Sequence, residues 1–179
     1  LQADNIQAAR KHYEAVLKEH ETRSQTLVAL AGLEARAGNT ARASDLVLKA
    51  HEADESAIQP RLLLARLRLQ EGDAEGALDV LTGSDGDILN QPAALELAGR
   101  AHLSLGEPAQ AIGVLSRWVN QAPESAQAHF LLAQAYSRSG DSQATVDQLE
   151  RVLEFDPDNT RALMLLVRAQ RRIGQDDKA

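Results

Sequence analysis

Residues 126–159 read AQAHFLLAQAYSRSGDSQATVDQLERVLEFDPDN, and this stretch decides the fold. Two segments in which apolar residues recur at helical spacing flank the turn Ser139-Gly140-Asp141. Gly140 permits the positive φ that ends a first helix, and the side chain of Asp141 can cap a second one. Pro157 cannot continue that second helix, so the chain turns again there. The stretch therefore predicts two packed helices that cannot bury their apolar sides without neighbouring units.

Glycines at a constant spacing indicate that this unit is repeated along the chain of 179 residues. They are Gly38, Gly72, Gly106, Gly140 and Gly174, and each lies 34 residues after the last. A fixed period of this length is typical of helical repeat arrays. We therefore expect a turn between two helices at each of the five glycines.

The period divides the chain into full and partial units. The full repeats cover about 24–57, 58–91, 92–125 and 126–159, and partial repeats cover 1–23 and 160–179. The sequence thus predicts a single array over residues 1–179, with about ten antiparallel helices, that starts and ends in mid-repeat. Asn39 is placed to cap the second helix of the first full repeat.

The register of small residues resembles the tetratricopeptide repeat (TPR). When the ladder glycine is counted as position 15, small side chains occupy position 8 (Ala31, Ala65, Gly99 and Ala133) and position 20 (Ala9, Ala43, Ala77 and Ala111). The aromatic residue usual at position 11 is present only as Tyr136. The resemblance implies an all-α, right-handed superhelix. In such a TPR solenoid the first helices line a concave groove through positions 2, 5, 9, 12 and 13.

A second resemblance concerns residues 60–81, PRLLLARLRLQEGDAEGALDVL. This segment is similar in sequence to large bacterial TPR lipoproteins associated with exosortase (PEP-CTERM) surface-protein sorting and exopolysaccharide export. That resemblance implies a periplasmic or membrane-tethered extracytoplasmic parent protein. Without it, a cytoplasmic location is the expectation.

The second helix of the second full repeat is interrupted. Gly83 and Gly86 follow ALDVL closely, and two glycines in four residues should stop a helix early. We expect a non-helical loop over residues 83–87, after which Ile88 and Leu89 pack a short turn back onto the core. The nearby acidic and amide side chains do not have the spacing of a calcium loop, so the loop predicts no metal site. They are Asp79, Asp85, Asp87 and Asn90.

The sequence offers no catalytic constellation. It contains no cysteine, and no two of its five histidines lie four residues apart. His102 and His129 occupy positions where the repeat family packs aromatic residues, so we interpret both as structural. Trp118 is interpreted as a packing residue in preference to an exposed binding anchor. We expect no cofactor and no enzymatic activity.

Arginines gather at the positions that would face the groove, and they are our candidate ligand-binding residues: Arg36, Arg66, Arg100, Arg138, Arg168 and Arg172. The first helices carry a net charge of +7 and the remainder −14, within a total of −7. Guanidinium groups donate paired hydrogen bonds to carboxylates, so the groove should bind an acidic peptide segment or an anionic polysaccharide. The alternative is that these arginines pair with Glu34, Glu96 or nearby carboxylates and only hold the groove in shape.

These observations predict a non-catalytic scaffold that binds a protein or peptide in its groove. Two alternatives are a helical-repeat nucleic-acid binder and a non-catalytic part of a larger enzyme. The acidic total and the scarcity of aromatic residues argue against nucleic acid. No apolar run is long enough to span a membrane. Leu163, Leu166 and Val167 on the last helix are expected to support self-association.

Overall fold

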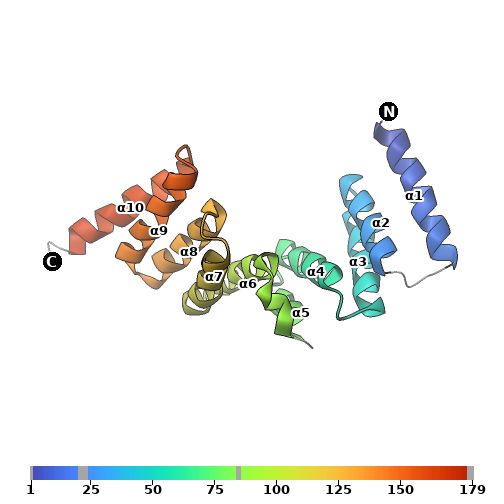
Figure 1. Ribbon diagram of the computed structural model, residues 1–179, viewed down its shortest axis with the longest axis horizontal. Coiled ribbons are helices and arrows are strands. Elements are labelled where there is room, and N and C mark those ends of the chain that lie inside the picture. The colour runs from blue at the N-terminus through green and yellow to red at the C-terminus, as the bar shows by residue number, and fades with distance from the viewer. Residues whose placement is uncertain (1, 20–23, 84–85, 177–179) are drawn as a thin grey trace. The chain divides into compact units, whose positions relative to one another are not determined.

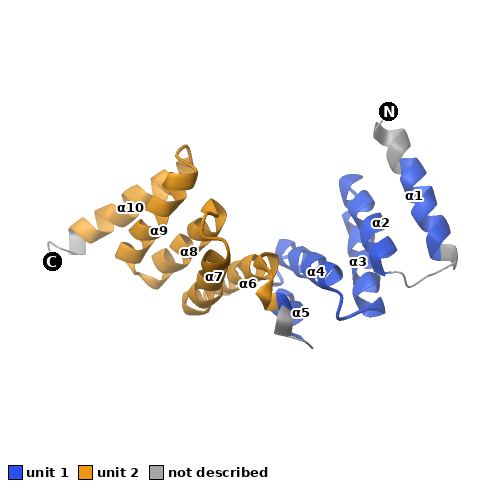
Figure 2. Cartoon of the chain, in the orientation of Figure 1, with its two compact units in different colours: residues 1–88 blue, residues 89–179 orange. Residues whose placement is uncertain are grey.

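The computed structural model describes residues 2–19, 24–83 and 86–176, and the elements within these ranges are helices (Figure 1). They are α1 (Gln2–Glu19), α2 (Ser24–Arg36), α3 (Thr40–Ala53), α4 (Ile58–Gln70), α5 (Ala74–Thr82), the 3₁₀ helix η1 (Gly86–Asn90), α6 (Pro92–Leu105), α7 (Pro108–Gln121), α8 (Ala126–Ser139), α9 (Ser142–Phe155) and α10 (Thr160–Asp176). The predicted all-α class and the pairing of helices within each repeat are confirmed. The chain forms two compact units, residues 1–88 and 89–179 (Figure 2), called unit 1 and unit 2 below.

Four of the five ladder glycines end a first helix in the same way. Gly38, Gly72, Gly106 and Gly140 have φ values of 81°, 84°, 74° and 92°. The amide of the next residue donates to the carbonyl five residues earlier, as from Asp141 to Tyr136 at 3.0 Å. This bond satisfies a carbonyl that the helix end would otherwise leave without a donor. The predicted turns at these four positions are therefore confirmed.

The turn predicted at Gly174 is wrong, because α10 continues through this residue to Asp176. Glycine permits the left-handed conformation but does not impose it, and in a helix it costs only about 1 kcal/mol relative to alanine. At the other four glycines the chain turns into a helix that packs back on the first. Within the described residues, no helix follows Gly174.

The predicted helix caps differ between two repeats. Asp141 caps α9, since its side chain accepts from the amide of Ala144 at 2.9 Å. Asn39 occupies the corresponding place before α3, but its side chain makes no capping bond. Its Nδ2 instead donates to a carboxylate oxygen of Glu34 at 2.7 Å. The prediction for Asn39 was wrong because a buried carboxylate competes for its side chain.

Side chains at positions 11 and 16 contact each other across the turn in three successive repeats. The pairs are Glu34 with Asn39 at 2.7 Å, Arg68 with Asp73 at 2.6 Å, and His102 with Glu107 at 2.7 Å. Position 11 lies in the last turn of the first helix, and position 16 directly precedes the second helix. Each pair therefore ties the two helices of one repeat together beside the glycine, with different residue types each time.

The core of each unit is made of small and branched side chains. In unit 1, Leu30 and Val47 are 1% and 2% exposed. In unit 2, Leu115 is fully buried and Trp118 is 7% exposed within the same cluster. The interpretation of Trp118 as a packing residue is confirmed.

The interrupted helix of the second repeat ends early, as the sequence predicts. α5 contains nine residues, whereas α7 and α9 contain 14 each. Ile88 is 2% exposed, which confirms the expected packing of a short turn. The non-helical loop predicted over 83–87 is partly wrong, because the 3₁₀ helix already includes Gly86. Short 3₁₀ turns of this kind are frequent connectors between helices. Ser84 and Asp85 lie outside the described residues.

A buried arginine compensates for the early end of α5. Arg61 on α4 is 2% exposed. Its guanidinium donates to the carbonyl oxygens of Val80 at 3.1 Å, Leu81 at 3.2 Å and Gly83 at 2.8 Å. The last carbonyls of a helix lack intrahelical donors and carry partial negative charge. Arg61 therefore supplies both the hydrogen bonds and the positive charge that this helix end requires.

Candidate ligand-binding surface

All six candidate arginines are exposed. In unit 1, Arg36 ends α2 and Arg66 lies in the middle of α4. In unit 2, Arg100 lies on α6 and Arg138 on α8, while α10 carries Arg168 and Arg172. Because the candidates belong to both units, a single arginine row along one groove stays a prediction. The geometry within each unit nevertheless separates arginines with partners from arginines without them.

Two arginines of unit 2 already have partners. Arg100 forms an ion pair with Glu96 one helical turn away, with Nη2 2.9 Å from Oε1. Arg138 donates to the carbonyl oxygen of Leu103, which joins α8 to the end of α6. Arg100 therefore makes the ion pair with Glu96 that the alternative named, and its role in ligand binding stays a prediction. Arg138 is also engaged, although its partner is a backbone carbonyl and not one of the carboxylates named in that alternative.

Arg168 and Arg172 lie together at a pocket of about 180 Å³ formed by α8, α9 and α10. The other lining residues are small or apolar: Ser137, Ser142, Thr145, Leu165 and Ala169. Arg172 also lies beside the turn, with Nη2 3.6 Å from where a Cβ on Gly140 would be. Within the described part of the chain, neither guanidinium makes a hydrogen bond or ion pair. This pocket therefore offers two available cations to an anionic group.

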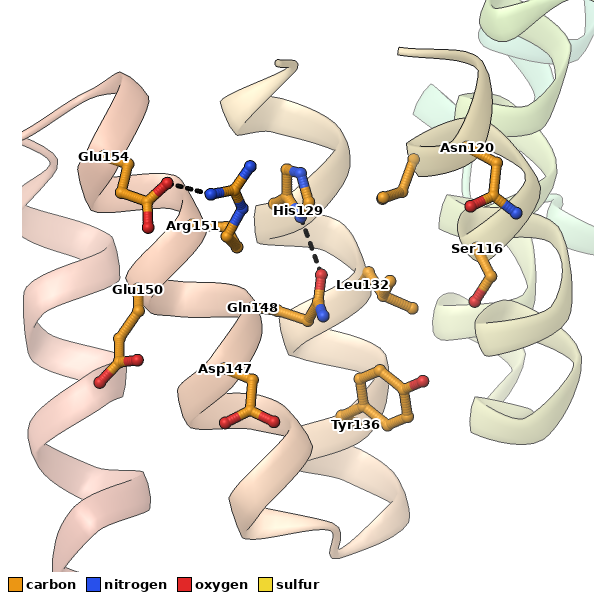
Figure 3. A pocket seen from close by; sticks show the side chains of 11 residues that line it. Ser116, Asn120, His129, Leu132, Tyr136, Asp147, Gln148, Glu150, Arg151 and Glu154 are labelled. Atoms are coloured by element: carbon orange, nitrogen blue, oxygen red, sulfur yellow. Dashed lines mark hydrogen bonds and ion pairs between the residues drawn. The ribbon is translucent and has the colours of Figure 1, made fainter. Parts of the chain in front are cut away.

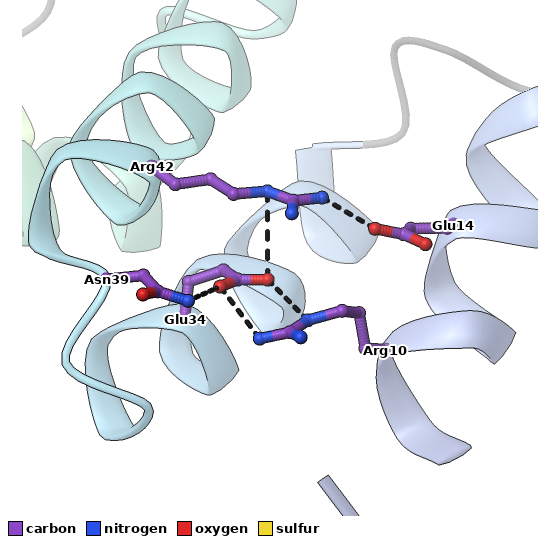
Figure 4. Close-up of polar contacts among 5 residues, drawn as sticks. All are labelled: Arg10, Glu14, Glu34, Asn39 and Arg42. Carbon is purple, nitrogen blue, oxygen red and sulfur yellow. Dashed lines mark hydrogen bonds and ion pairs between the residues drawn. The ribbon is translucent and has the colours of Figure 1, made fainter. Parts of the chain in front are cut away.

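In unit 1, Arg36 and Arg66 likewise make no hydrogen bond or ion pair with any described residue. Glu34, which the alternative named as a partner for the groove arginines, is 0% exposed and is occupied elsewhere. It binds Arg10 through two hydrogen bonds of 2.7 and 3.0 Å (Figure 4). Arg42 approaches Glu34 with its Nε at 3.7 Å. The alternative that a candidate arginine pairs with Glu34 is therefore wrong.

Glu34 joins three helices of unit 1. Its partners come from α1 (Arg10), from the turn after α2 (Asn39) and from α3 (Arg42). The hydrogen bond from Asn39 is the largest cause of a lowered pKa of this carboxyl group. Arg10 and Arg42 lower the pKa further, while burial acts in the opposite direction. Glu34 is therefore an ionised anchor and not a ligand-binding group.

The burial of Glu34 and of Arg61 was not predicted from the sequence. For Arg61 a signal existed, because position 4 holds Leu27 and Leu95 in neighbouring repeats, and both are buried. His129 shares this position, is 5% exposed and has both ring nitrogens within hydrogen-bonding distance of oxygen atoms. The structural interpretation of His129 is therefore confirmed. His102 contacts Glu107, as described above.

The described residues contain no group of three or more histidine, cysteine or acidic side chains placed to hold a metal ion. One of the acidic residues that the sequence analysis weighed against a calcium loop, Asp85, lies outside the described residues. No helix among those described has both the length and the hydropathy needed to cross a membrane.

Family models identify the repeats. Two models of the tetratricopeptide repeat match the chain, one at residues 68–135 and the other at residues 126–159. The match agrees with the turns and helix pairs described above. The chain belongs to the TPR family, whose members are generally non-catalytic, and this membership supports a role as a protein-interaction scaffold.

Solved structures show the same fold at low sequence identity. PilF of Pseudomonas aeruginosa is 17% identical, with a TM-score of 0.80 over 99% of this chain and 81% of that one. MamA is 19% identical, with a TM-score of 0.75 over 89% and 94%. YrrB, described as a TPR protein with an unusual peptide-binding site, is 16% identical, with a TM-score of 0.76 over 95% and 86%. No curated protein matches the sequence.

Proposed function

We propose that the chain is a scaffold that binds an acidic segment of a partner protein, with Arg168 and Arg172 at the centre of the site. The observation that carries the proposal is the pocket in which these two guanidinium groups lie together with no hydrogen bond or ion pair to any described residue. The likeness to YrrB, whose description names a peptide-binding site, supports a peptide as the ligand. Arg36 and Arg66, which also make no hydrogen bond or ion pair with any described residue, are separate candidate contacts within unit 1.

The small size of the pocket fits a carboxylate group and not a whole ligand. A volume of about 180 Å³ accommodates an acidic side chain, and the serine and threonine hydroxyls can donate further hydrogen bonds to it. Exposed ion pairs contribute only about 0–1 kcal/mol each, so useful affinity requires several contacts along the segment. Binding should therefore weaken as salt concentration rises. A role in bacterial exopolysaccharide export or surface-protein sorting rests on the lipoprotein resemblance alone.

The test replaces the two pocket arginines without changing the rest of the helix. The immobilised acidic peptide Gly-Ser-Glu-Leu-Gly-Glu-Leu-Gly-Glu-Leu-Ser-Gly serves as probe, and capture is compared between the native chain and R168Q/R172Q. The control K11Q/K49Q removes the same charge from exposed positions on α1 and α3, which neither line the pocket nor occupy positions expected to face the groove. We expect capture to fall about fivefold or more in the pocket variant only, which corresponds to about 1 kcal/mol.

Equal capture by the native chain and the pocket variant would refute the proposal. A similar loss in both double variants would show attraction by overall charge alone, and would also refute it. Melting temperatures are measured in parallel. A large decrease for R168Q/R172Q would assign these arginines to structural pairing.

A further inference from the structure

A second pocket in unit 2 lies on another side of the repeat from the candidate arginines. It has a volume of about 600 Å³ and is formed by α7, α8 and α9 (Figure 3). Helix α8 contributes His129, Leu132 and Tyr136, which share one face because helical residues advance by about 100° each. The predicted groove residues Gln134 and Arg138 lie on the opposite face of that helix. The pocket therefore opens between the second helices of two successive repeats.

The charge of this pocket is opposite to that of the arginine surface. Its lining includes the carboxylates of Asp147, Glu150 and Glu154 and a single guanidinium, that of Arg151. Arg151 forms an ion pair with Glu154 and lies over the ring of Phe155, 5.2 Å from its centre. One carboxylate is thus neutralised. The other two leave the pocket with a net negative charge.

The two remaining carboxylates are available to a ligand. Among the described residues, Asp147 accepts one neutral hydrogen bond, from the side-chain Nε2 of Gln143 at 2.9 Å. Glu150 makes no hydrogen bond or ion pair with any described residue. Both are exposed at the pocket rim, since α9 turns them toward solvent. A cation entering here would therefore meet two anions without first displacing an internal partner.

The rest of the lining matches a peptide better than a free ion. Val119, Leu132 and Tyr136 provide an apolar wall along which the methylene groups of a lysine or a leucine side chain can pack. Ser116 and Asn120 on α7 have no side-chain hydrogen bond among the described residues, so both can bond to a peptide backbone. A pocket of a few hundred Å³ with apolar walls and a few polar groups is typical of ligand sites.

We propose that the pocket between α7, α8 and α9 binds a basic segment of a partner protein, with a lysine or arginine side chain held between Asp147 and Glu150. This surface is distinct from the arginine surface and does not depend on it. The chain would then present an anion-binding and a cation-binding site on different sides of its repeats. A scaffold of this kind can hold two segments of unlike charge at once.

The test uses the fluorescein-labelled peptide Gly-Ser-Lys-Leu-Gly-Lys-Leu-Gly-Lys-Leu-Ser-Gly and measures fluorescence anisotropy together with amide chemical shifts. Binding should shift the amide signals of residues that line the pocket. D147N/E150Q should raise the Kd about fivefold or more, since two ion pairs are lost. The control E124Q/D158N removes the same charge from exposed positions of unit 2 outside the pocket, and its Kd should stay within about twofold of the native value.

A second variant tests shape without a change of charge. Asn120 is exposed on α7 at the edge of the pocket, and N120W should fill the pocket while leaving both carboxylates in place. We expect it to weaken binding as strongly as D147N/E150Q. Equal weakening by the pocket and control charge variants, or no pocket shifts at millimolar peptide, would overturn the proposal. R168Q/R172Q leaves this site intact. The effect of that variant on capture of the acidic peptide is therefore independent of whether this pocket binds the basic peptide.

Discussion

Unit 1 and unit 2 build the same helix pairs with different chemistry. Unit 1 buries two charged side chains, Glu34 and Arg61, whereas the corresponding positions in unit 2 include Tyr136 and Leu95. The repeat register determines which positions face inward, but it does not determine which residue occupies them. A charged residue is accommodated at such a position when every polar group finds a partner.

The difference has an energetic consequence. An apolar residue packed among leucines can be replaced by another of similar volume at a cost of less than about 1.5 kcal/mol. A buried charge with several hydrogen bonds has no such substitutes, because removing it leaves its partners buried without their bonds. Unit 1 should therefore be the more sensitive of the two to single substitutions at its inward-facing charges. Three predictions test this difference.

The largest effect is expected for R61L. This variant removes three hydrogen bonds from carbonyls at the end of α5 and should destabilise unit 1 by about 3 kcal/mol. Hydrogen–deuterium exchange over residues 58–82 measures the loss. Fluorescence of Trp118, the one tryptophan of the chain, reports on unit 2 and should change little.

The matched control is R66L, on the same helix α4, where the arginine is exposed and makes no hydrogen bond or ion pair with any described residue. It should change the stability by less than about 0.5 kcal/mol. If R61L and R66L had equal effects, the hydrogen bonds of Arg61 would not be needed to stabilise the end of α5.

A smaller effect is expected for E34Q. The variant keeps the size of the side chain but removes the charge that Arg10, Asn39 and Arg42 surround, so we expect a loss of about 2 kcal/mol at neutral pH. Urea denaturation followed by exchange in α1, α2 and α3 would measure this. In contrast, E96Q in unit 2 breaks an ion pair that is partly exposed and should cost less than about 0.5 kcal/mol. A neutral E34Q would contradict the role of Glu34 as an anchor.

The smallest effect should appear on mild acidification. The pKa of Glu34 is lowered by its hydrogen bond from Asn39, that of Asp54 by its bond from Ser56, and that of Asp73 by its bond from Gly76. A carboxyl whose pKa is lower in the folded state contributes stability above its unfolded pKa and loses it as the pH falls through the folded pKa. All three residues belong to unit 1.

Unit 1 should therefore lose stability progressively below about pH 4.5, the ordinary value for a glutamate. Hydrogen–deuterium exchange in α2 and α3 is measured at falling pH and corrected for intrinsic rates. The corrected exchange rate should rise before the fluorescence of Trp118 changes. In E34Q the slope of stability against pH should be shallower. An unchanged slope would show that Glu34 titrates at the same pH whether folded or unfolded.

The fold could be predicted from the sequence because its determinants are local and repeated. Gly38 and Gly106 fix turns through φ, and the early end of α5 follows from Gly83. The continuation of α10 through Gly174 was not predictable from spacing alone, because a glycine only permits a turn. That the repeats form one continuous array stays a prediction.

The candidate site was harder to predict than the fold. Register placed Arg168 and Arg172 on one helix, and the structure brings both to one pocket. The repeat register could not show that Arg100 and Arg138 already have hydrogen-bond partners, since hydrogen bonds depend on side-chain conformation. The pocket of α7, α8 and α9 was also not predicted from the sequence. A pocket between three helices leaves no signature in any one of them.

The contacts between positions 11 and 16 constrain how such a chain can change over generations. Glutamate with asparagine, arginine with aspartate and histidine with glutamate all join the same two helices. The contact therefore depends on a compatible pair of side chains at the two positions and not on the identity of either. Replacing one member alone passes through a mismatched intermediate, as when N39D places a second carboxylate against that of Glu34. Exchange of both members in one event, as when a whole repeat is duplicated or recombined, avoids that intermediate.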